Sequence, residues 1–199
     1  MLWCGVAIPF LYIGSDTICS ALYSGYSYRD WSISELSAIG APTAGLWAIL
    51  IAPYNPLLIL LGIGILLMKN IKKSVKIAGV LLVLSGITGY GWAFFPMNTR
   101  GNIGTPSDTG HLVMAALTVF LMALFIAFGS GAGNKWFRVY SFLTLAAMLG
   151  FGAYVGFQAP LVAANLPTPW LGIWERISVF GPMIWLAAFA AVLLRKREI

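Results

Sequence analysis

The chain has 199 residues, of which 60% are hydrophobic and only 9% are charged. An average soluble domain carries roughly 25% charged residues, so this chain has too little polar surface to coat a water-soluble globule. Intrinsic disorder is excluded as well, because it requires low hydrophobicity together with high charge. The composition therefore indicates an integral membrane protein, and we treat residues 1–199 as a single membrane domain.

Six apolar stretches have the length of a transmembrane helix, since a bilayer core about 30 Å thick is spanned by about 20 helical residues. None shows the alternation of an outer-membrane barrel strand, and helices are the remaining way to satisfy the backbone in lipid. We predict an all-α integral membrane protein with six transmembrane helices. The spans are Leu2–Tyr23, Gly45–Met68, Ile77–Phe95, His111–Phe128, Val139–Phe157 and Ile177–Leu194.

The basic residues gather in three segments that lie on one side of a six-span serpentine. These segments contain nine of the 12 basic residues, namely Lys69, Lys72, Lys73, Lys76, Lys135, Arg138, Arg195, Lys196 and Arg197, and the acid Glu198 follows them. The positive-inside rule then predicts that the N and C termini are cytoplasmic. We read the net charge of +6 as an orientation signal, and expect no nucleic-acid binding because no basic patch lies outside these segments.

The first outer loop, residues 24–44, contains a helix-start signal. Ser32 and Glu35 have the spacing of a capping box, apolar residues follow at intervals of three, and Gly40 suits a helix stop. We predict a short surface helix that lies on the membrane or dips into it. Capping alone explains Glu35, so a structural role and a site role both stay open.

The second outer loop leads into the fourth span, which we predict Ser107 or Asp108 to cap. Asp108 and His111 are three residues apart and can face the same way on a helix. A carboxylate beside an imidazole can position a metal, perform general acid–base chemistry, or only form a hydrogen bond. A metal site needs about three protein ligands, and with one histidine in the chain we expect no cofactor.

Asp16 is the most informative acid, because it lies within the first span. It stands roughly 21 Å along the helix from Leu2, which places it in the outer third of the hydrocarbon. An isolated carboxylate there costs at least about 2.5–3.5 kcal/mol, so Asp16 should face the bundle interior and be protonated or paired. Arg176 and Arg100 are the arginines best placed to reach it. A site residue and a structural ion pair between the first and last spans are both open interpretations.

The third outer loop carries another helix-start signal, with Thr168 as the predicted cap and Pro169 at the first helical position. The helix continues into the sixth span, where Glu175 and Arg176 enter near the outer interface. Adjacent residues on a helix point about 100° apart, so these two need not pair with each other.

The outer loops together resemble a known family. The strings that carry the resemblance are Tyr26–Asp30, Ile33–Thr43, Phe95-Pro-Met, Arg100-Gly, His111, Pro167–Gly172 and Glu175-Arg176. They resemble the bacterial membrane family called domain of unknown function 998, nearly from end to end. The resemblance implies a six-span protein of the bacterial plasma (inner) membrane without an established reaction. It also implies characteristic polar positions at Ser34, Glu35, Arg100, His111, Glu175 and Arg176.

These residues favour an outward-facing polar pocket that binds a lipid headgroup or another anionic small ligand, with a lipid-directed hydrolase as an extension. The candidate catalytic residues are Glu35, Asp108, His111 and Glu175, and the candidate ligand-binding residues are Asp16, Ser34, Arg100 and Arg176. Whether the chain is an enzyme stays open. One alternative is a small-solute transporter, although the apolar inner halves of the spans argue against a complete path. The other is a non-catalytic membrane partner or assembly protein. Membrane lipids are the expected partners, and any protein partner is unidentified.

Overall fold

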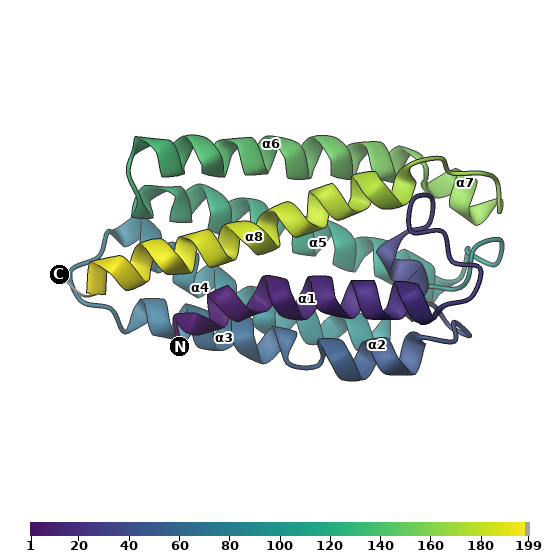
Figure 1. Cartoon of the computed structure of the whole chain (residues 1–199), viewed down its shortest axis with the longest axis horizontal. Coiled ribbons are helices and arrows are strands. Elements are labelled where there is room, and N and C mark those ends of the chain that lie inside the picture. Colours follow the sequence, from purple (N-terminus) through teal and green to yellow (C-terminus); the bar gives the residue numbers. More distant parts are fainter. Residues whose placement is uncertain (198–199) are drawn as a thin grey trace.

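The computed structural model of the chain describes residues 1–197, so Glu198, predicted on the cytoplasmic side, lies outside the described residues. Six helical segments are long and apolar enough to cross a membrane, and no β-strand occurs among residues 1–197. This confirms the predicted all-helical, six-span architecture (Figure 1). The segments are α1 (Trp3–Leu22), α2 (Ala44–Ile51) with α3 (Tyr54–Leu66), α4 (Lys73–Thr88) continued by the 3-10 helix η2 (Gly89–Phe94), α5 (Pro106–Gly129), α6 (Lys135–Phe157) and α8 (Leu171–Arg197). Shorter helices are η1 (Ile33–Ser37), η3 (Ser130–Ala132) and α7 (Ala159–Ala163).

Four of these helices begin earlier than predicted, because a helix starts at its cap and not at its first apolar residue. At α5 the cap is Thr105, whose side chain accepts a hydrogen bond from the Asp108 amide, and Pro106 is the first helical residue. Asp108 stands at the third helical position and completes a capping box. The prediction that Ser107 or Asp108 is the cap was therefore wrong by two or three positions.

Small residues bring α3 and α4 into direct contact. A Cβ atom added to Gly62 would lie 2.5 Å from the carbonyl oxygen of Gly79 and 2.9 Å from the backbone nitrogen of Val83. Gly86 has an equally close neighbour in the carbonyl oxygen of Asn55, at 2.8 Å. Helices in lipid associate through such close packing, because lipid chains are as apolar as leucine.

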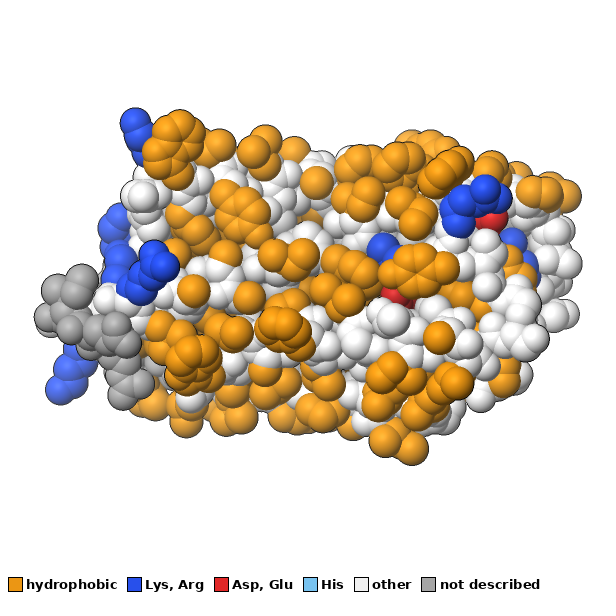
Figure 2. Space-filling view, in the orientation of Figure 1, with side chains coloured by type: hydrophobic (Ala, Val, Ile, Leu, Met, Phe, Trp, Pro, Cys, Tyr) orange, Lys and Arg blue, Asp and Glu red, His pale blue; other side chains and the backbone are white. Residues whose placement is uncertain are grey.

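The last helix, α8, runs through the middle of the bundle and packs against α1 and α6 (Figure 1). Trp185 and Phe189 of α8 are completely buried and stack on each other and on Phe137 of α6. The indole Nε1 of Trp185 donates a hydrogen bond of 2.8 Å to Ser141 Oγ. Apolar side chains cover much of the flank that Figure 2 shows, as expected for helices that face lipid.

The two ends of the bundle differ in charge. Figure 2 shows Lys and Arg side chains gathered at the end where the N-terminus lies and α8 finishes. The opposite end carries the polar loops, and there the first of them forms η1. Ile33 and Leu36 of η1 are buried against Cys19 of α1, while Gly40 adopts a φ of +86° after the helix has ended. The segment predicted as a short helix is thus a 3-10 helix packed on the bundle.

Candidate functional site

A buried ion pair joins the first and last helices. Arg176 of α8 donates from Nε to Asp16 Oδ2 at 2.9 Å and from Nη2 to Asp16 Oδ1 at 2.8 Å. The side chains are 4% and 0% exposed, so water does not weaken the pair. The structure thus pairs Asp16 with one of the two arginines that the sequence placed within its reach.

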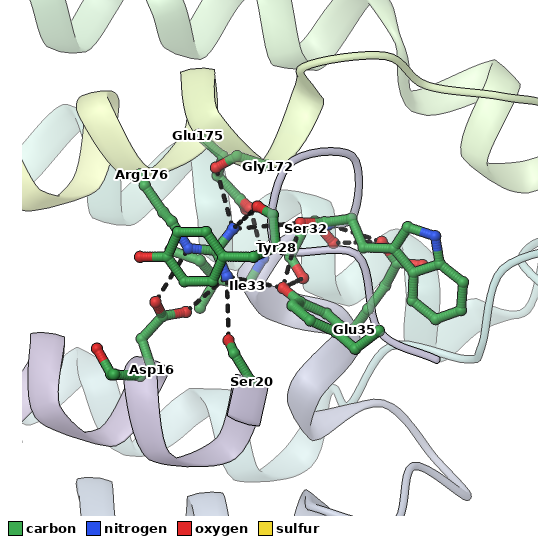
Figure 3. A network of polar contacts seen from close by, with 12 residues as sticks. Asp16, Ser20, Tyr28, Ser32, Ile33, Glu35, Gly172, Glu175 and Arg176 are labelled. Carbon is green, nitrogen blue, oxygen red and sulfur yellow. Dashed lines mark hydrogen bonds and ion pairs between the residues drawn. The ribbon is translucent and has the colours of Figure 1, made fainter. Parts of the chain in front are cut away.

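Arg176 also holds the first outer loop in place (Figure 3). Its Nη1 donates to the carbonyl oxygens of Tyr28, Trp31 and Gly172 at 2.9, 3.3 and 3.1 Å. Its Nη2 donates to Tyr26 Oη at 2.8 Å, and the Tyr28 ring centroid lies 3.6 Å from the guanidinium carbon. All three nitrogens of the Arg176 guanidinium, which together carry its five N–H donors, therefore donate hydrogen bonds. This favours a structural role for Arg176 over a role in binding a ligand.

Tyr26 extends the same contacts. Its hydroxyl accepts from Arg176 and donates to the Ser32 carbonyl oxygen at 2.7 Å. Burial raises the pKa of Tyr26 well above its usual value, although the nearby Arg176 opposes the shift. The hydroxyl therefore keeps its proton and bridges the arginine to the backbone that precedes η1.

A second ion pair lies closer to the molecular surface. Arg100 donates from Nε to Glu35 Oε1 at 2.6 Å and from Nη2 to Glu35 Oε2 at 3.0 Å. Glu35 Oε2 also accepts from the Ser32 amide at 2.7 Å, which confirms the predicted capping box. The Arg100 guanidinium lies over the Trp31 ring, 4.7 Å from its centroid. Glu35 thus completes the capping box of η1 and is also the partner of Arg100.

Arg100 differs from Arg176 in having an unused edge. Its contact with Glu35 is side-on and takes up Nε and Nη2, and Nη2 also donates to Thr168 Oγ1 at 3.3 Å. Nη1 makes no hydrogen bond to any residue that the structure describes. Arg100 borders a hollow of about 340 Å³, whose lining residues are Tyr23, Trp31, Glu35, Thr99, Arg100 and Asn165.

Asp108 orders the second outer loop and makes no hydrogen bond to His111 within residues 1–197. Its carboxylate accepts from the Asn98 amide at 2.7 Å, the Asn98 side chain at 3.0 Å and the Gly104 amide at 2.9 Å. The amide and the hydroxyl of Thr105 donate to it as well. The expected side-by-side placement of Asp108 and His111 therefore does not lead to a hydrogen-bonded pair, because the loop that precedes α5 folds back onto the carboxylate.

His111 instead contacts the first outer loop. Its Nδ1 lies 3.0 Å from the carbonyl oxygen of Phe95, and its Nε2 lies 3.1 Å from Ser34 Oγ. The Trp92 ring packs edge-on against the imidazole at 4.7 Å between centroids. His111 is buried and Ser34 is half-buried. Six of the eight predicted site residues thus form an Asp16–Arg176 pair, an Arg100–Glu35 pair and a Ser34–His111 pair.

Glu175 reaches η1 and not Arg176. Its Oε2 accepts from the Ile33 amide at 2.5 Å (Figure 3). Like Glu35, it therefore holds the start of the 3-10 helix, although it comes from the far end of the chain. Within residues 1–197, no three His, Cys, Asp or Glu side chains come together in a group that could hold a metal ion.

Asp30 is an organising residue that the sequence interpretation did not single out, although it lies in one of the strings that carry the family resemblance. It accepts from Arg29 and from the Trp170 amide. Hydrogen bonding from the Arg29 guanidinium is the main cause that lowers the pKa of Asp30, to about 2. The Asp30 carbonyl accepts from Thr168 Oγ1 at 2.7 Å, so Thr168 is not the predicted cap, and α8 begins at Leu171 instead.

Residues 6–192 match the profile of a family described as "Protein of unknown function (DUF998)". The chain belongs to the DUF998 family. The match confirms the resemblance drawn from the outer loops, and it includes every residue of the three pairs described above. No curated protein and no solved structure matches this DUF998 chain.

Proposed function

We propose that this chain is a multi-pass protein of the bacterial plasma membrane that binds the anionic headgroup of a lipid, or a related anionic small ligand, on its outer side. Both termini then lie in the cytoplasm, and η1 lies at the outer membrane surface. The gathering of basic residues at the end with the N-terminus supports this orientation. The hollow beside Arg100 lies among the loops of the opposite end.

The unused edge of Arg100 carries the proposal. Arginine N–H groups donate to phosphate and carboxylate oxygens, and here the two N–H groups of Nη1 are available, whereas Nη2 already donates to Glu35 and Thr168. Glu35 and the Trp31 ring fix the plane of this guanidinium. A ligand that binds to Nη1 therefore does not have to order a free side chain, which would cost entropy. The side chain is 11% exposed, which keeps bulk water from screening the charge completely.

The hollow is large enough for a headgroup and not for a whole lipid. Its volume of about 340 Å³ lies at the lower end of the range for small-molecule sites, about 300–1,000 Å³. Thr99 and Asn165 supply polar groups beside the arginine, and Tyr23 supplies an aromatic wall. The acyl chains of a bound lipid would then extend along the apolar flanks of the bundle.

Lipid retention tests this function. The purified protein is titrated with phosphatidylglycerol, with phosphatidylcholine and with inorganic phosphate, and bound molecules are counted by native mass spectrometry. Arg100→Gln combined with Glu35→Gln removes the guanidinium without leaving a buried carboxylate alone. Hydrogen bonds to charged groups contribute about 1.5–3 kcal/mol, so we expect phosphatidylglycerol to bind about tenfold or more weakly to the double variant.

Arg29→Gln is the matched control, because it removes an outer arginine that pairs with Asp30 and does not border the hollow. We expect this variant to bind phosphatidylglycerol as the wild type does. Binding of inorganic phosphate alone would identify a free anion as the ligand. Equal retention of phosphatidylglycerol by the double variant, with unchanged circular dichroism, would refute the proposed site.

A further inference from the structure

The Ser34–His111 pair has a geometry that the headgroup site does not use. Ser34 Oγ lies 3.1 Å from His111 Nε2, although the two residues are 77 positions apart in the sequence. The neighbouring hydroxyl of Ser32 donates to Glu35, and that of Ser37 donates to the Ser34 carbonyl oxygen. Ser34 is therefore the one hydroxyl of η1 that faces an imidazole.

The position of the histidine proton follows from the other contact of the ring. His111 Nδ1 lies 3.0 Å from the Phe95 carbonyl oxygen, and a carbonyl oxygen can only accept a hydrogen bond. In the neutral imidazole, Nδ1 thus carries the hydrogen and Nε2 carries the lone pair. Nε2 then accepts the hydrogen bond of the Ser34 hydroxyl. This arrangement activates a serine, because a base lies beside the nucleophilic hydroxyl and a third group orients the base.

In the proposed orientation, with α5 beginning at the outer membrane surface, the pair lies at the depth where the ester groups of a lipid are found. His111 is five residues into α5, or about 7.5 Å below the start of the helix. The hydrocarbon core is about 30 Å thick and the polar interfaces add roughly 5–8 Å on each side, so this depth is the boundary between them.

The side chains around the pair face outward. Leu112 and Val113, which follow His111, are 59% and 61% exposed, and Phe94 is 76% exposed. These apolar side chains meet lipid in a membrane, and Ser34 itself is half-buried. An acyl chain that lies against this surface has its ester group close to the level of Ser34.

We propose that Ser34 is an acyl-accepting nucleophile and His111 is its general base, with ester-linked membrane lipids as the substrate class. The inference rests on the proposed function for its substrate, since the lipids would be those whose headgroup Arg100 holds. The Phe95 carbonyl oxygen is a positioning group, because it acts only by orienting the imidazole.

The reaction consists of two transfers. Ser34 Oγ forms a bond to the ester carbonyl carbon while its proton moves to His111 Nε2. The bond from that carbon to the lipid's alkoxy oxygen breaks, and the proton on Nε2 passes to this leaving oxygen. Water then attacks the acyl-serine, gives a proton to Nε2, and releases a fatty acid as the proton returns to Ser34 Oγ. No oxidant or reductant is needed.

An alkyl fluorophosphonate tests the nucleophile directly, because it forms a stable bond to an activated serine and has no lipid headgroup. We expect the intact wild-type protein to gain one adduct and peptide mapping to place it on Ser34. Ser34→Ala should abolish the adduct, and His111→Gln should slow its formation about 10²–10⁴-fold, which is the usual contribution of a general base. Ser37→Ala is the control and should label as the wild type does.

A second measurement follows fatty acid released from phosphatidylglycerol in nanodiscs, with Ser34→Ala as the blank. An adduct that forms on folded His111→Gln at the wild-type rate would overturn the base assignment, and a folded wild type without an adduct on Ser34 would overturn the nucleophile. Labelling without release of fatty acid would overturn the ester reaction. The two proposals have separate readouts in the wild type, because fluorophosphonate has no headgroup and its labelling reports on Ser34, whereas retention of phosphatidylglycerol in the native mass spectrum reports on Arg100.

Discussion

Removing the guanidinium of Arg176 is expected to destabilise the protein strongly. Arg176→Gln leaves Asp16 as a lone carboxylate with an exposure of 0%. Removing one partner of a buried ion pair typically costs about 3–5 kcal/mol, because the remaining charge is uncompensated. The variant also leaves the Tyr28 carbonyl oxygen without its donor and removes one of the two donors of the Trp31 carbonyl oxygen, so we expect a loss in the upper part of this range.

Thermal unfolding in detergent, followed by tryptophan fluorescence, measures the effect. For a domain of this size, 1 kcal/mol corresponds to a change in Tm of about 2–4 °C, so a loss of about 4–5 kcal/mol in Arg176→Gln should lower Tm by about 8–20 °C. Arg29→Gln breaks an ion pair whose arginine is 59% exposed and should lower Tm by much less than Arg176→Gln, since exposed pairs contribute about 0–1 kcal/mol.

A combined replacement of both partners sharpens the test. Asp16→Leu with Arg176→Met removes the two charges together, so no buried charge is left alone, and exchanges of this kind are often neutral or stabilising. We expect the double variant to recover part of the lost Tm, but not all of it, because the Tyr28 carbonyl oxygen stays without its donor. A fall in Tm for Arg176→Gln no larger than that for Arg29→Gln would refute the reasoning.

Two further predictions follow from the loops and the helix contacts. The carboxyl of Asp30 should titrate by NMR with a midpoint near pH 2, and Arg29→Gln should raise this midpoint towards about 3.9; a wild-type midpoint near 3.9 would contradict the pairing. Because the folded-state pKa is lowered, the stabilisation from Asp30 is present above about pH 4 and is lost as the pH falls towards 2. Gly62→Val should lower Tm by several degrees, because its Cβ would lie 2.5 Å from the Gly79 carbonyl oxygen. Gly14→Ala is the control and should be neutral or slightly stabilising, because no atom lies within 4 Å of its Cβ. Equal effects of the two glycine substitutions would show that α3 and α4 are not in close contact.

The membrane-spanning architecture could be predicted because lipid leaves few choices. A segment that crosses the bilayer must be long, apolar and internally hydrogen-bonded, and each of these properties is visible in the sequence. The same reasoning predicted that Asp16 is paired and named Arg176 and Arg100 as its possible partners, since a carboxylate in lipid needs a partner; the structure selects Arg176. The capping box of Ser32 and Glu35 was also visible, because its residues are local.

The arrangement of the outer loops could not be predicted in the same way. Asp108 has the right spacing to face His111, but the loop that ends at Thr105 folds back and occupies its oxygens. The contact of His111 with Ser34 joins α5 to η1, two elements that no periodic pattern relates. Which side chains meet there depends on how the loops pack, and one sequence contains no signal for that.

Local signals also failed where a tertiary contact was stronger. Thr168 followed by proline is typical of a helix start, but its hydroxyl donates to the Asp30 carbonyl instead. Trp170 then adopts a φ of +66°, a backbone conformation that non-glycine residues rarely take. The contact between two loops thus delays the start of α8 beyond the position that the sequence favours.

The separation of Asp16 from Arg176 along the chain has a consequence for biogenesis. The two residues are 160 positions apart, and ribosomes add about 5–20 residues per second, so the acid exists for roughly 8–32 s before its cation has been made. The first transmembrane segment is therefore either released into lipid while Asp16 is uncompensated or protonated, or retained by the insertion machinery until the sixth transmembrane segment has been made. Retention predicts that a nascent chain stalled before residue 176 crosslinks to that machinery through its first segment and that Asp16→Leu frees it, whereas release into lipid predicts no such crosslink.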